Sequence, residues 1–327
     1  MITRVHHLNC VSGCPLGGLL MDGRSRSLRG RLTSHCLLLE TESGLVLIDT
    51  GYGLRDVAEP RARLSKLFLT LVKPELREEM TAIRQIQALG LDPRDVQHIV
   101  LSHLDFDHAG GLDDFPQARV HLLAAEVESA TAQRTLLDRM RYRPEQWGNR
   151  ELWRAYSGGQ GDAWKGFSNV RSLDGLPPEI LMVPLIGHTL GHAGVAVSTG
   201  SGWLLYAADA YFYHGEMQIE PHCTPGLRLY QTLMEKDRKQ RLANQVRLRE
   251  LVQSDSGVKV FCGHDVTEFE RLSGRPFSAP ATAARRSVEQ LRYQLHDLSS
   301  KISEAPDSSH DRARTDPQSG GASSLRI

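Results

Sequence analysis

The chain has 327 residues, of which 40% are hydrophobic and 24% charged, a balance typical of soluble globular proteins. Lysine plus arginine equals aspartate plus glutamate at 39 each, and the resulting zero net charge argues against a nucleic acid partner. No apolar run approaches the roughly 18 residues of a membrane span, and the opening MITRVHHLNC lacks the apolar stretch of a secretory signal, so we expect a cytoplasmic protein with no membrane partner.

Short apolar runs bounded by turn residues predict strands along much of the chain. The run HCLLLETESGLVLIDTG at 35–51 reads as two strands joined by a tight turn, which is the pattern of a hairpin. A further run at 118–127 reads as a strand that continues into a helix. The other strands are expected at 96–102, 179–185, 194–209 and 258–265.

Helical spacing of apolar residues fills the intervals between the strands. Two insertions, near 55–92 and 128–168, are expected to be helical, and 228–254 and 283–299 predict amphipathic helices. Strands in two batches with helices between them favour sheets covered by helices. We therefore expect one domain over 1–298. The following residues, 299–327, are rich in Ser, Asp, Pro and Gly and predict a disordered C-terminal tail.

The stretch IVLSHLDFDHAGGL, residues 99–112, places four side chains that can bind a metal within six positions. It follows an apolar strand and ends in glycines that allow a tight turn, and strand ends of this kind often carry functional residues. The alternative is a solvated polar loop. Because histidine and carboxylate ligands are so dense here, the stretch favours a metal site built from His103, Asp105, Asp107 and His108.

Three later strand ends carry similar side chains. PLIGHTLGHAGV places His188 and His192 after one strand, and the strands at 204–209 and 258–264 end at Asp209 and His264. An ionised aspartate at the end of a buried strand is costly unless it is paired or bound to metal. Each of these residues alone has a structural explanation, but their recurrence at strand ends supports one shared metal site.

This order of motifs resembles the metallo-β-lactamase superfamily, whose leading H-x-H-x-D-H motif is followed by a separated His, Asp and His. The resemblance covers about residues 30–270, and LVLIDTG at 45–51 is similar to an early family strand whose aspartate, here Asp49, supports the site from behind the ligands. It implies an α+β fold, an αββα sandwich of two mixed sheets flanked by helices. It also implies a two-metal site at one edge of that sandwich.

The resemblance further implies two divalent metal ions per chain, with zinc ahead of iron or manganese. Asp209 would bridge the two ions, and His192 would line the pocket or support the site. The remaining ligands would divide between the ions as His103, Asp105 and His188 for the first and Asp107, His108 and His264 for the second.

Asp105 is the departure from the family, because the commonest pattern has histidine at this position. Two divalent ions carry four positive charges, which the carboxylates of Asp105, Asp107 and Asp209 together with one hydroxide would cancel. A neutral ligand sphere is a weaker Lewis acid than one with a net positive charge. Harder oxygen ligands also shift the preference from zinc toward iron or manganese.

Such a centre predicts a binuclear metal-dependent hydrolase, in which a metal-bridging hydroxide cleaves a lactone or other small ester. The substrate would be a small molecule, the protein a monomer or homodimer, and Asp107 or Asp209 the catalytic group that relays a proton. Quorum-quenching lactonases of this fold have a tyrosine three residues after the bridging aspartate. That position is a phenylalanine here, so the neighbouring Tyr211 and Tyr213 are expected either near the pocket or packed beneath the site.

Other functions remain open at this stage. A thioesterase or phosphodiesterase would use the same centre, and a phosphodiesterase would favour a basic cleft. The nearest candidates, Arg139, Arg141 and Arg143, are interpreted as a solvated helix face. A di-iron redox protein would need a flavin domain, for which too little chain follows residue 270. A non-catalytic ligand-binding protein would not need the full ligand set.

Overall fold

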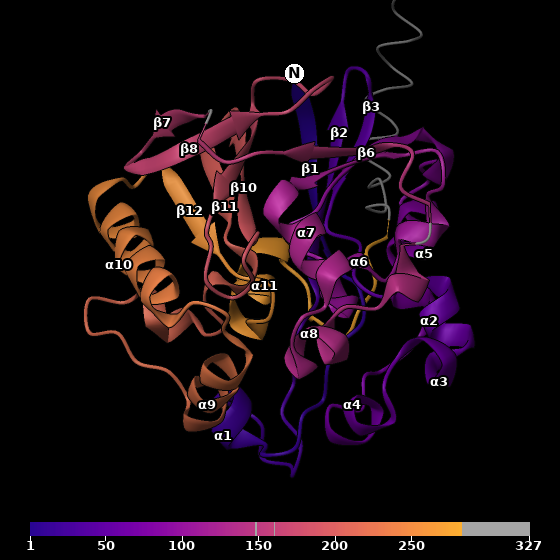
Figure 1. The fold of residues 1–327 in the computed structure, drawn as a ribbon, viewed down its shortest axis with the longest axis vertical. Coiled ribbons are helices and arrows are strands. Elements are labelled where there is room, and N and C mark those ends of the chain that lie inside the picture. The colour runs from indigo at the N-terminus through magenta and orange to yellow at the C-terminus, as the bar shows by residue number, and fades with distance from the viewer. Residues whose placement is uncertain (148, 160, 283–327) are drawn as a thin grey trace, which may run out of the picture. The chain divides into compact units, whose positions relative to one another are not determined.

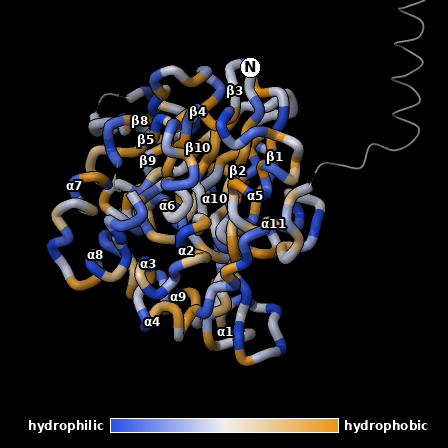
Figure 2. Tube along the Cα trace, turned by 90° about the vertical axis from the view of Figure 1, so that its right-hand side faces the viewer, coloured by the Kyte–Doolittle hydropathy of each residue, from blue (hydrophilic) through white to orange (hydrophobic). Residues whose placement is uncertain are grey.

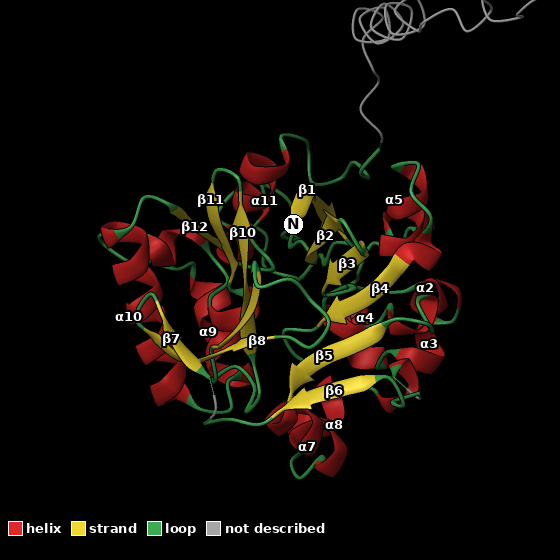
Figure 3. Ribbon diagram, turned by 90° about the horizontal axis from the view of Figure 1, so that it is seen from above, coloured by secondary structure: helices red, strands yellow, loops and turns green. Residues whose placement is uncertain are grey.

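The computed structural model describes residues 1–147, 149–159 and 161–282, and its framework is two six-stranded sheets (Figures 1 and 3). The first sheet has the order β1-β2-β3-β4-β5-β6 and the second the order β12-β11-β10-β9-β8-β7. The strands are β1 (Ile2–Asn9), β2 (His35–Thr41), β3 (Gly44–Ile48), β4 (Val96–Val100), β5 (Arg119–Leu123), β6 (Trp153–Tyr156), β7 (Asp162–Trp164), β8 (Phe167–Ser172), β9 (Ile180–Pro184), β10 (Ala193–Thr199), β11 (Gly202–Tyr206) and β12 (Val258–Phe261).

Both sheets are mixed, as predicted. In the first, β1, β2 and β3 pair antiparallel, which confirms the hairpin at 35–51, whereas β3 to β6 pair parallel. In the second, β7 to β11 pair antiparallel and only the β11–β12 pair is parallel. Helices follow β3, β5 and β11 along the chain, because parallel neighbours need a crossover connection.

The alternation of side chains along the strands builds separate apolar layers. In β2, Leu37 and Leu39 pack between the sheets, while Leu38 faces the outer side of the first sheet. In β10, Val195 packs between the sheets and Ala196 faces the outer side of the second. Figure 2 shows hydrophobic segments concentrated along these central strands. Sheets that are apolar on both faces require helices on the outside.

Helices supply those outer layers (Figures 1 and 3). Ala82 and Ile86 of α5 (Ala82–Ala88) pack on the first sheet, and Leu248 and Leu251 of α10 (Arg238–Ser254) pack on the second. The result is the predicted αββα sandwich. The remaining α-helices are α1 (Leu19–Asp22), α2 (Leu54–Ala58), α3 (Pro60–Arg63), α4 (Lys66–Leu71), α6 (Phe106–Ala109), α7 (Ala124–Ala132), α8 (Leu136–Arg141), α9 (Pro225–Met234) and α11 (Val266–Ser273), and the 3₁₀ turns are Glu78–Met80, Pro93–Asp95, Leu112–Asp114, Pro144–Gln146, Ala208–Ala210 and His214–Met217.

Two helical predictions need correction. The insertion at 128–168 is helical only as far as Gln146, after which β6, β7 and the start of β8 are strands. Strand β6 is the edge of its sheet and is largely exposed, so its sequence lacks the apolar run of a buried strand. The predicted helix at 228–254 is two helices, because the chain turns at 235–237 and the amides of Lys236 and Asp237 donate to Gly187 O.

The strand predicted to run into a helix at 118–127 is confirmed by β5 and α7, and the helical insertion near 55–92 by α2 to α5. Strand β1, Ile2–Asn9, is one that the sequence had not indicated. The predicted helix at 283–299 and the predicted tail at 299–327 lie outside the described residues. Within the described part of the chain, no helix has the length and apolar character needed to cross a membrane.

Candidate metal centre

The candidate ligands lie where strands of both sheets end. His103 comes shortly after β4, and His188 follows β9. Asp209 follows β11, and His264 follows β12. The rigid sheets thus bring together side chains that are up to 161 positions apart in the sequence, from 103 to 264.

One group of possible ligands consists of His103, Asp105 and His188. The Nε2 atoms of His188 and His103 lie 3.0 Å and 3.4 Å from Asp105 Oδ2. All three side chains are buried. We refer to these residues as half 1 of the cluster. The cluster consists of the candidate ligands His103, Asp105, Asp107, His108, His188, Asp209 and His264.

The other group consists of Asp107, His108 and His264, and we refer to it as half 2. The Nε2 atoms of His264 and His108 lie 3.8 Å and 4.0 Å from the Asp107 carboxylate. The two histidines are buried, but 20% of the Asp107 side chain is exposed. Half 2 is therefore the more open of the two.

Asp209 lies between the halves. Its Oδ2 is 3.4 Å from His188 Nε2 and 3.8 Å from His103 Nε2, which belong to half 1. Its Oδ1 is 3.2 Å from His108 Nε2 and 3.1 Å from His264 Nε2, which belong to half 2. Burial alone would raise the pKa of Asp209, but the neighbouring histidines hold it well below its usual range. Oδ2 also lies 3.2 Å from His264 Nε2, so the carboxylate contacts the histidines of both halves.

Two histidines of half 2 are oriented through Nδ1. His108 Nδ1 lies 2.7 Å from Asp49 Oδ2, and His264 Nδ1 lies 2.6 Å from the carbonyl oxygen of Thr33. A carboxylate and a carbonyl can only accept, so Nδ1 carries the hydrogen in both rings. In the neutral form of each ring, Nε2 then has a lone pair that faces the cluster, which is the arrangement of a histidine that ligates metal.

Asp49 organises the loop that carries the leading motif. Its Oδ1 accepts from the amide of Ser102, and its Oδ2 accepts from Ser102 Oγ and from the hydroxyl of Tyr206. Because Ser102 Oγ donates to Asp49, it accepts from His103 Nδ1 at 2.9 Å, which leaves His103 Nε2 bare as well. Asp49 adopts a φ of 52°, a left-handed conformation that aspartate tolerates better than most residues. These contacts place Asp49 beside Ser102 and His108, on the Nδ1 side of the His108 ring.

Glycine at position 263 leaves room for the end of β11 beside His264. A Cβ atom at Gly263 would lie 3.2 Å from the Tyr206 hydroxyl and 3.3 Å from Asp209 Oδ1. Both neighbours are held by hydrogen bonds or burial, so a larger residue would push His264 away from the cluster. Glycine at this position therefore keeps His264 beside Asp209.

The model of the metallo-beta-lactamase superfamily matches residues 29–264, which include every candidate ligand. The chain belongs to this superfamily. A probable metallo-hydrolase of Mycobacterium tuberculosis is 38% identical over 263 residues, which is 80% of each chain. An N-acyl homoserine lactonase of Bacillus cereus is 27% identical over 237 residues, which cover 71% of this chain and 81% of that protein.

Solved structures agree at the level of the fold. A structure of an N-acyl homoserine lactone hydrolase with its product N-hexanoyl-L-homoserine matches with a TM-score of 0.63 and 23% identity. It covers 85% of this chain and 99% of that chain. The metallo-β-lactamase fold inferred from the strand-end motifs is thus confirmed.

The cluster of this superfamily member has the chemical character of a metal site. His103 Nε2, His108 Nε2, Asp105 Oδ1 and Asp209 Oδ1 are buried and make no hydrogen bond within the described chain. His188 Nδ1 is a fifth such atom. Buried polar atoms are almost always satisfied, so five exceptions in one cluster require a ligand. Imidazole nitrogens and carboxylate oxygens are the donors that zinc, iron and manganese accept. The residues present therefore fit divalent metal ions.

Asp105 has a partner that the sequence did not indicate. Arg141, at the end of α8, donates to Asp105 Oδ2 through Nη2 at 2.8 Å and through Nε at 3.2 Å. The interpretation of 139–143 as a solvated helix face is wrong for Arg141, which is completely buried. Burial opposes ionisation of Asp105, but Arg141 together with His103 and His188 outweighs this effect and holds the pKa of the carboxyl well below its usual range.

A second group missed by sequence reasoning is Glu126 of α7, which is completely buried. Its carboxylate accepts hydrogen bonds from the amide of Leu104, the hydroxyl of Thr189 and the amide of Gly191. It therefore joins the loop of the leading motif to the loop of His188. A lone glutamate in a helix carries no sequence signal for such a role.

The remaining predicted site residues lie around the cluster. His192 donates through Nδ1 to Leu185 O, and its Nε2 accepts from the amide of Asp209 at 3.0 Å. The Tyr211 hydroxyl donates to Glu268, not to a candidate ligand. Tyr213 is half-buried beside the loop that carries His264. Phe212, between the two tyrosines, stacks on the His264 ring with centroids 5.0 Å apart.

Proposed function

We propose that this superfamily member is a binuclear metal-dependent hydrolase that cleaves a lactone or other small ester. The observation that carries the proposal is the position of Asp209, whose carboxylate contacts the histidines of both halves. A carboxylate that contacts the Nε2 atoms of four histidines is suited to bridge two ions. Family membership supports metal-dependent hydrolysis, and the names of the lactonase relatives support the ester class.

In this proposal, half 1 and half 2 each hold one divalent ion, and zinc is preferred to iron or manganese. When bound, the ions supply Lewis acidity and an activated water. Ser102, Asp49 and Thr33 fix the histidine rings so that their Nε2 atoms face the ions. Ligand rings held in this way bind metal without further reorganisation.

Asp107 is the group that we assign to proton transfer. It is the one carboxylate of the cluster with a substantial exposed fraction, 20% against 6% for Asp105 and 4% for Asp209. A group that relays protons must reach substrate or solvent. Asp209 is better suited to a structural bridge, because it is buried and surrounded by histidines.

Aromatic side chains beside the cluster support a substrate with an apolar portion. Phe106, between Asp105 and Asp107 in sequence, contacts Phe68 with ring centroids 4.3 Å apart. On the other side, Phe212 stacks on His264, and Tyr230 packs edge-on against Phe212. These groups suit an acyl chain better than a charged phosphodiester, and Arg141, the nearest buried cation, is already engaged by Asp105.

The test is a hydrolysis panel of acyl lactones, aryl esters, thioesters and phosphodiesters, with the protein loaded with zinc, manganese or iron. We expect the highest kcat/KM for a lactone or ester, loss of activity on chelation and recovery when the metal is restored. Preference for thioesters or phosphodiesters would replace the ester assignment. Undiminished hydrolysis after complete metal removal would exclude the metal-dependent mechanism.

A further inference from the structure

The pairing of Asp105 with Arg141 extends the proposed function and rests on it. Arg141 is completely buried, and its guanidinium makes contacts on three sides. Nη2 and Nε donate to Asp105 Oδ2, and Nη1 donates to the carbonyl oxygens of His188 and Met234 at 3.0 Å and 3.2 Å. Nη2 also lies 2.8 Å from His188 Nε2. A buried cation with this many partners has one fixed position.

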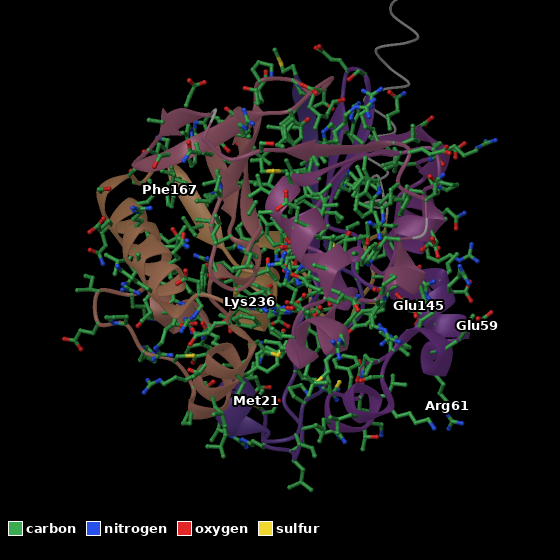
Figure 4. All side chains as sticks on the ribbon, in the orientation of Figure 1. Met21, Glu59, Arg61, Glu145, Phe167 and Lys236 are labelled. Atoms are coloured by element: carbon green, nitrogen blue, oxygen red, sulfur yellow. The ribbon has the colours of Figure 1, made fainter. Side chains whose placement is uncertain are left out.

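The backbone and a second ion pair keep Arg141 in place. Asp105 and Tyr142 form an antiparallel β-bridge, so the chain that carries Arg141 runs directly beside the leading motif. Helix α8 begins with a capping box formed by Thr135 and Asp138. Asp138 in turn accepts from Lys236 Nζ at 2.6 Å, and Figure 4 shows Lys236 at the centre of the view near α8. These contacts anchor α8 against the segment between α9 and α10.

The charge of this pair accounts for the departure of Asp105 from the common family motif. An aspartate in place of histidine adds one negative charge to half 1, and Arg141 adds one positive charge at 2.8 Å from that carboxylate. The sum equals that of a neutral histidine. Arg141 binds only Oδ2 and leaves Oδ1 of Asp105 without a hydrogen bond, so one carboxylate oxygen stays available.

We propose that Arg141 is a positioning residue of the metal centre, which holds the Asp105 carboxylate and offsets its charge so that the two residues together replace one neutral histidine. Half 2 has no such partner: within the described residues, Asp107 forms ion pairs with histidines and with no arginine or lysine. Half 1 together with Arg141 therefore carries no net charge, whereas half 2 keeps the single negative charge of Asp107.

The experiment is a double-substitution cycle on the zinc-loaded full chain, with Asp105→His, Arg141→Met and the double variant. Elemental analysis and equilibrium competition with a chelator give the number and affinity of bound zinc ions, independently of activity. In Asp105→His the charge of Arg141 is no longer offset, so we expect the weaker zinc ion to bind at least about tenfold less tightly. In the double variant the neutral balance returns, and we expect affinity within about threefold of the original chain.

Controls separate charge from damage to the helix. Arg139→Met removes an exposed arginine of the same helix and should change neither zinc number nor affinity. Asp105→His with Arg141→Lys keeps the positive charge and should stay weak. If Asp105→His does not fold, Asp105→Asn repeats the comparison with a side chain of nearly the original shape.

The outcomes distinguish a failure of the proposed role of Arg141 from a failure of the proposed metal centre. Equal zinc affinity for Asp105→His with and without Arg141→Met would overturn the role of Arg141 and leave the hydrolase proposal standing. An original chain that binds no zinc, manganese or iron would overturn the metal centre itself.

Discussion

The two halves of the cluster bury their carboxylates in different ways. In half 1, Asp105 is buried and tied to the guanidinium of Arg141. In half 2, Asp107 is partly exposed and lies no closer than 3.8 Å to its histidines. A buried carboxylate requires a cation in the folded chain, whereas an exposed one can rely on solvent. We therefore expect half 1 to be important for stability as well as metal binding, and half 2 to be important mainly for chemistry.

The largest effect is expected where both halves depend on one residue. Asp209→Asn removes the charge that faces four histidines, so metal affinity and hydrolysis should both fall by at least about 100-fold. Asp174→Asn, at an exposed aspartate away from the cluster, is the matched control and should change neither. Retention of full zinc affinity in Asp209→Asn would show that the halves do not share this carboxylate.

Substitution of Asp105 and of Asp107 compares the contributions of half 1 and half 2 to the free energy of unfolding. Asp105→Asn leaves Arg141 as a buried cation without its partner and should lower the free energy of unfolding of the metal-free chain by about 3–5 kcal/mol. Asp107→Asn should change it by less than about 1 kcal/mol, because that side chain is partly exposed and its pairs are long. Urea unfolding measures both values, and equal losses would contradict the contrast between the halves.

The pH dependence of stability tests the contribution of Glu268, a buried residue of the helix that follows His264. Burial and the nearby Asp265 raise the pKa of Glu268, in α11 after His264, from 4.5 to about 7. The folded chain then holds this proton over a pH range in which the unfolded chain has lost it. Protonated Glu268 therefore makes its full contribution to the free energy of unfolding below pH 4.5. This contribution falls by about 3 kcal/mol as the pH rises to about 7.

Glu268→Gln removes this titration. Urea unfolding of both chains between pH 5 and 7.5 should show the stability of the original chain falling relative to that of the variant. Parallel curves would mean that Glu268 titrates alike in the folded and unfolded chain.

The smallest effect is expected at Tyr206, which donates to Asp49, the residue that orients the His108 ring. Tyr206→Phe removes one of the hydrogen bonds to Asp49, which keeps its bonds from Ser102 and His108, so zinc affinity should fall by about tenfold at most. Tyr211→Phe is the control, because its hydroxyl bonds Glu268 and not a residue of the cluster. Equal losses in chelator competition would indicate a general effect of removing a buried hydroxyl.

The strands and the candidate ligands could be predicted because each rests on a local pattern. An apolar run followed by a histidine or aspartate marks a strand end, and four such ends indicate one edge of a sandwich. Asp49 could be placed for the same reason, since it follows the apolar β3.

Arg141 and Glu126 could not be predicted, because their function depends on tertiary contacts. Arg141 lies among other arginines in a polar segment, and only the β-bridge between Asp105 and Tyr142 brings it to the cluster. Strand β6 was missed for a related reason: it is an exposed edge strand whose pairing with β5 involves residues far away in sequence. Local periodicity carries no information about such partners.

The most direct test of the central claim is the metal content of the purified chain, measured with its hydrolytic activity before and after chelation. We expect about two divalent ions per chain after metal loading. Activity on an acyl lactone or ester should disappear with the ions and return when they are restored. A chain that binds no more than one ion under saturating metal would contradict the binuclear centre, and a metal-free chain with full activity would contradict the metal-dependent mechanism.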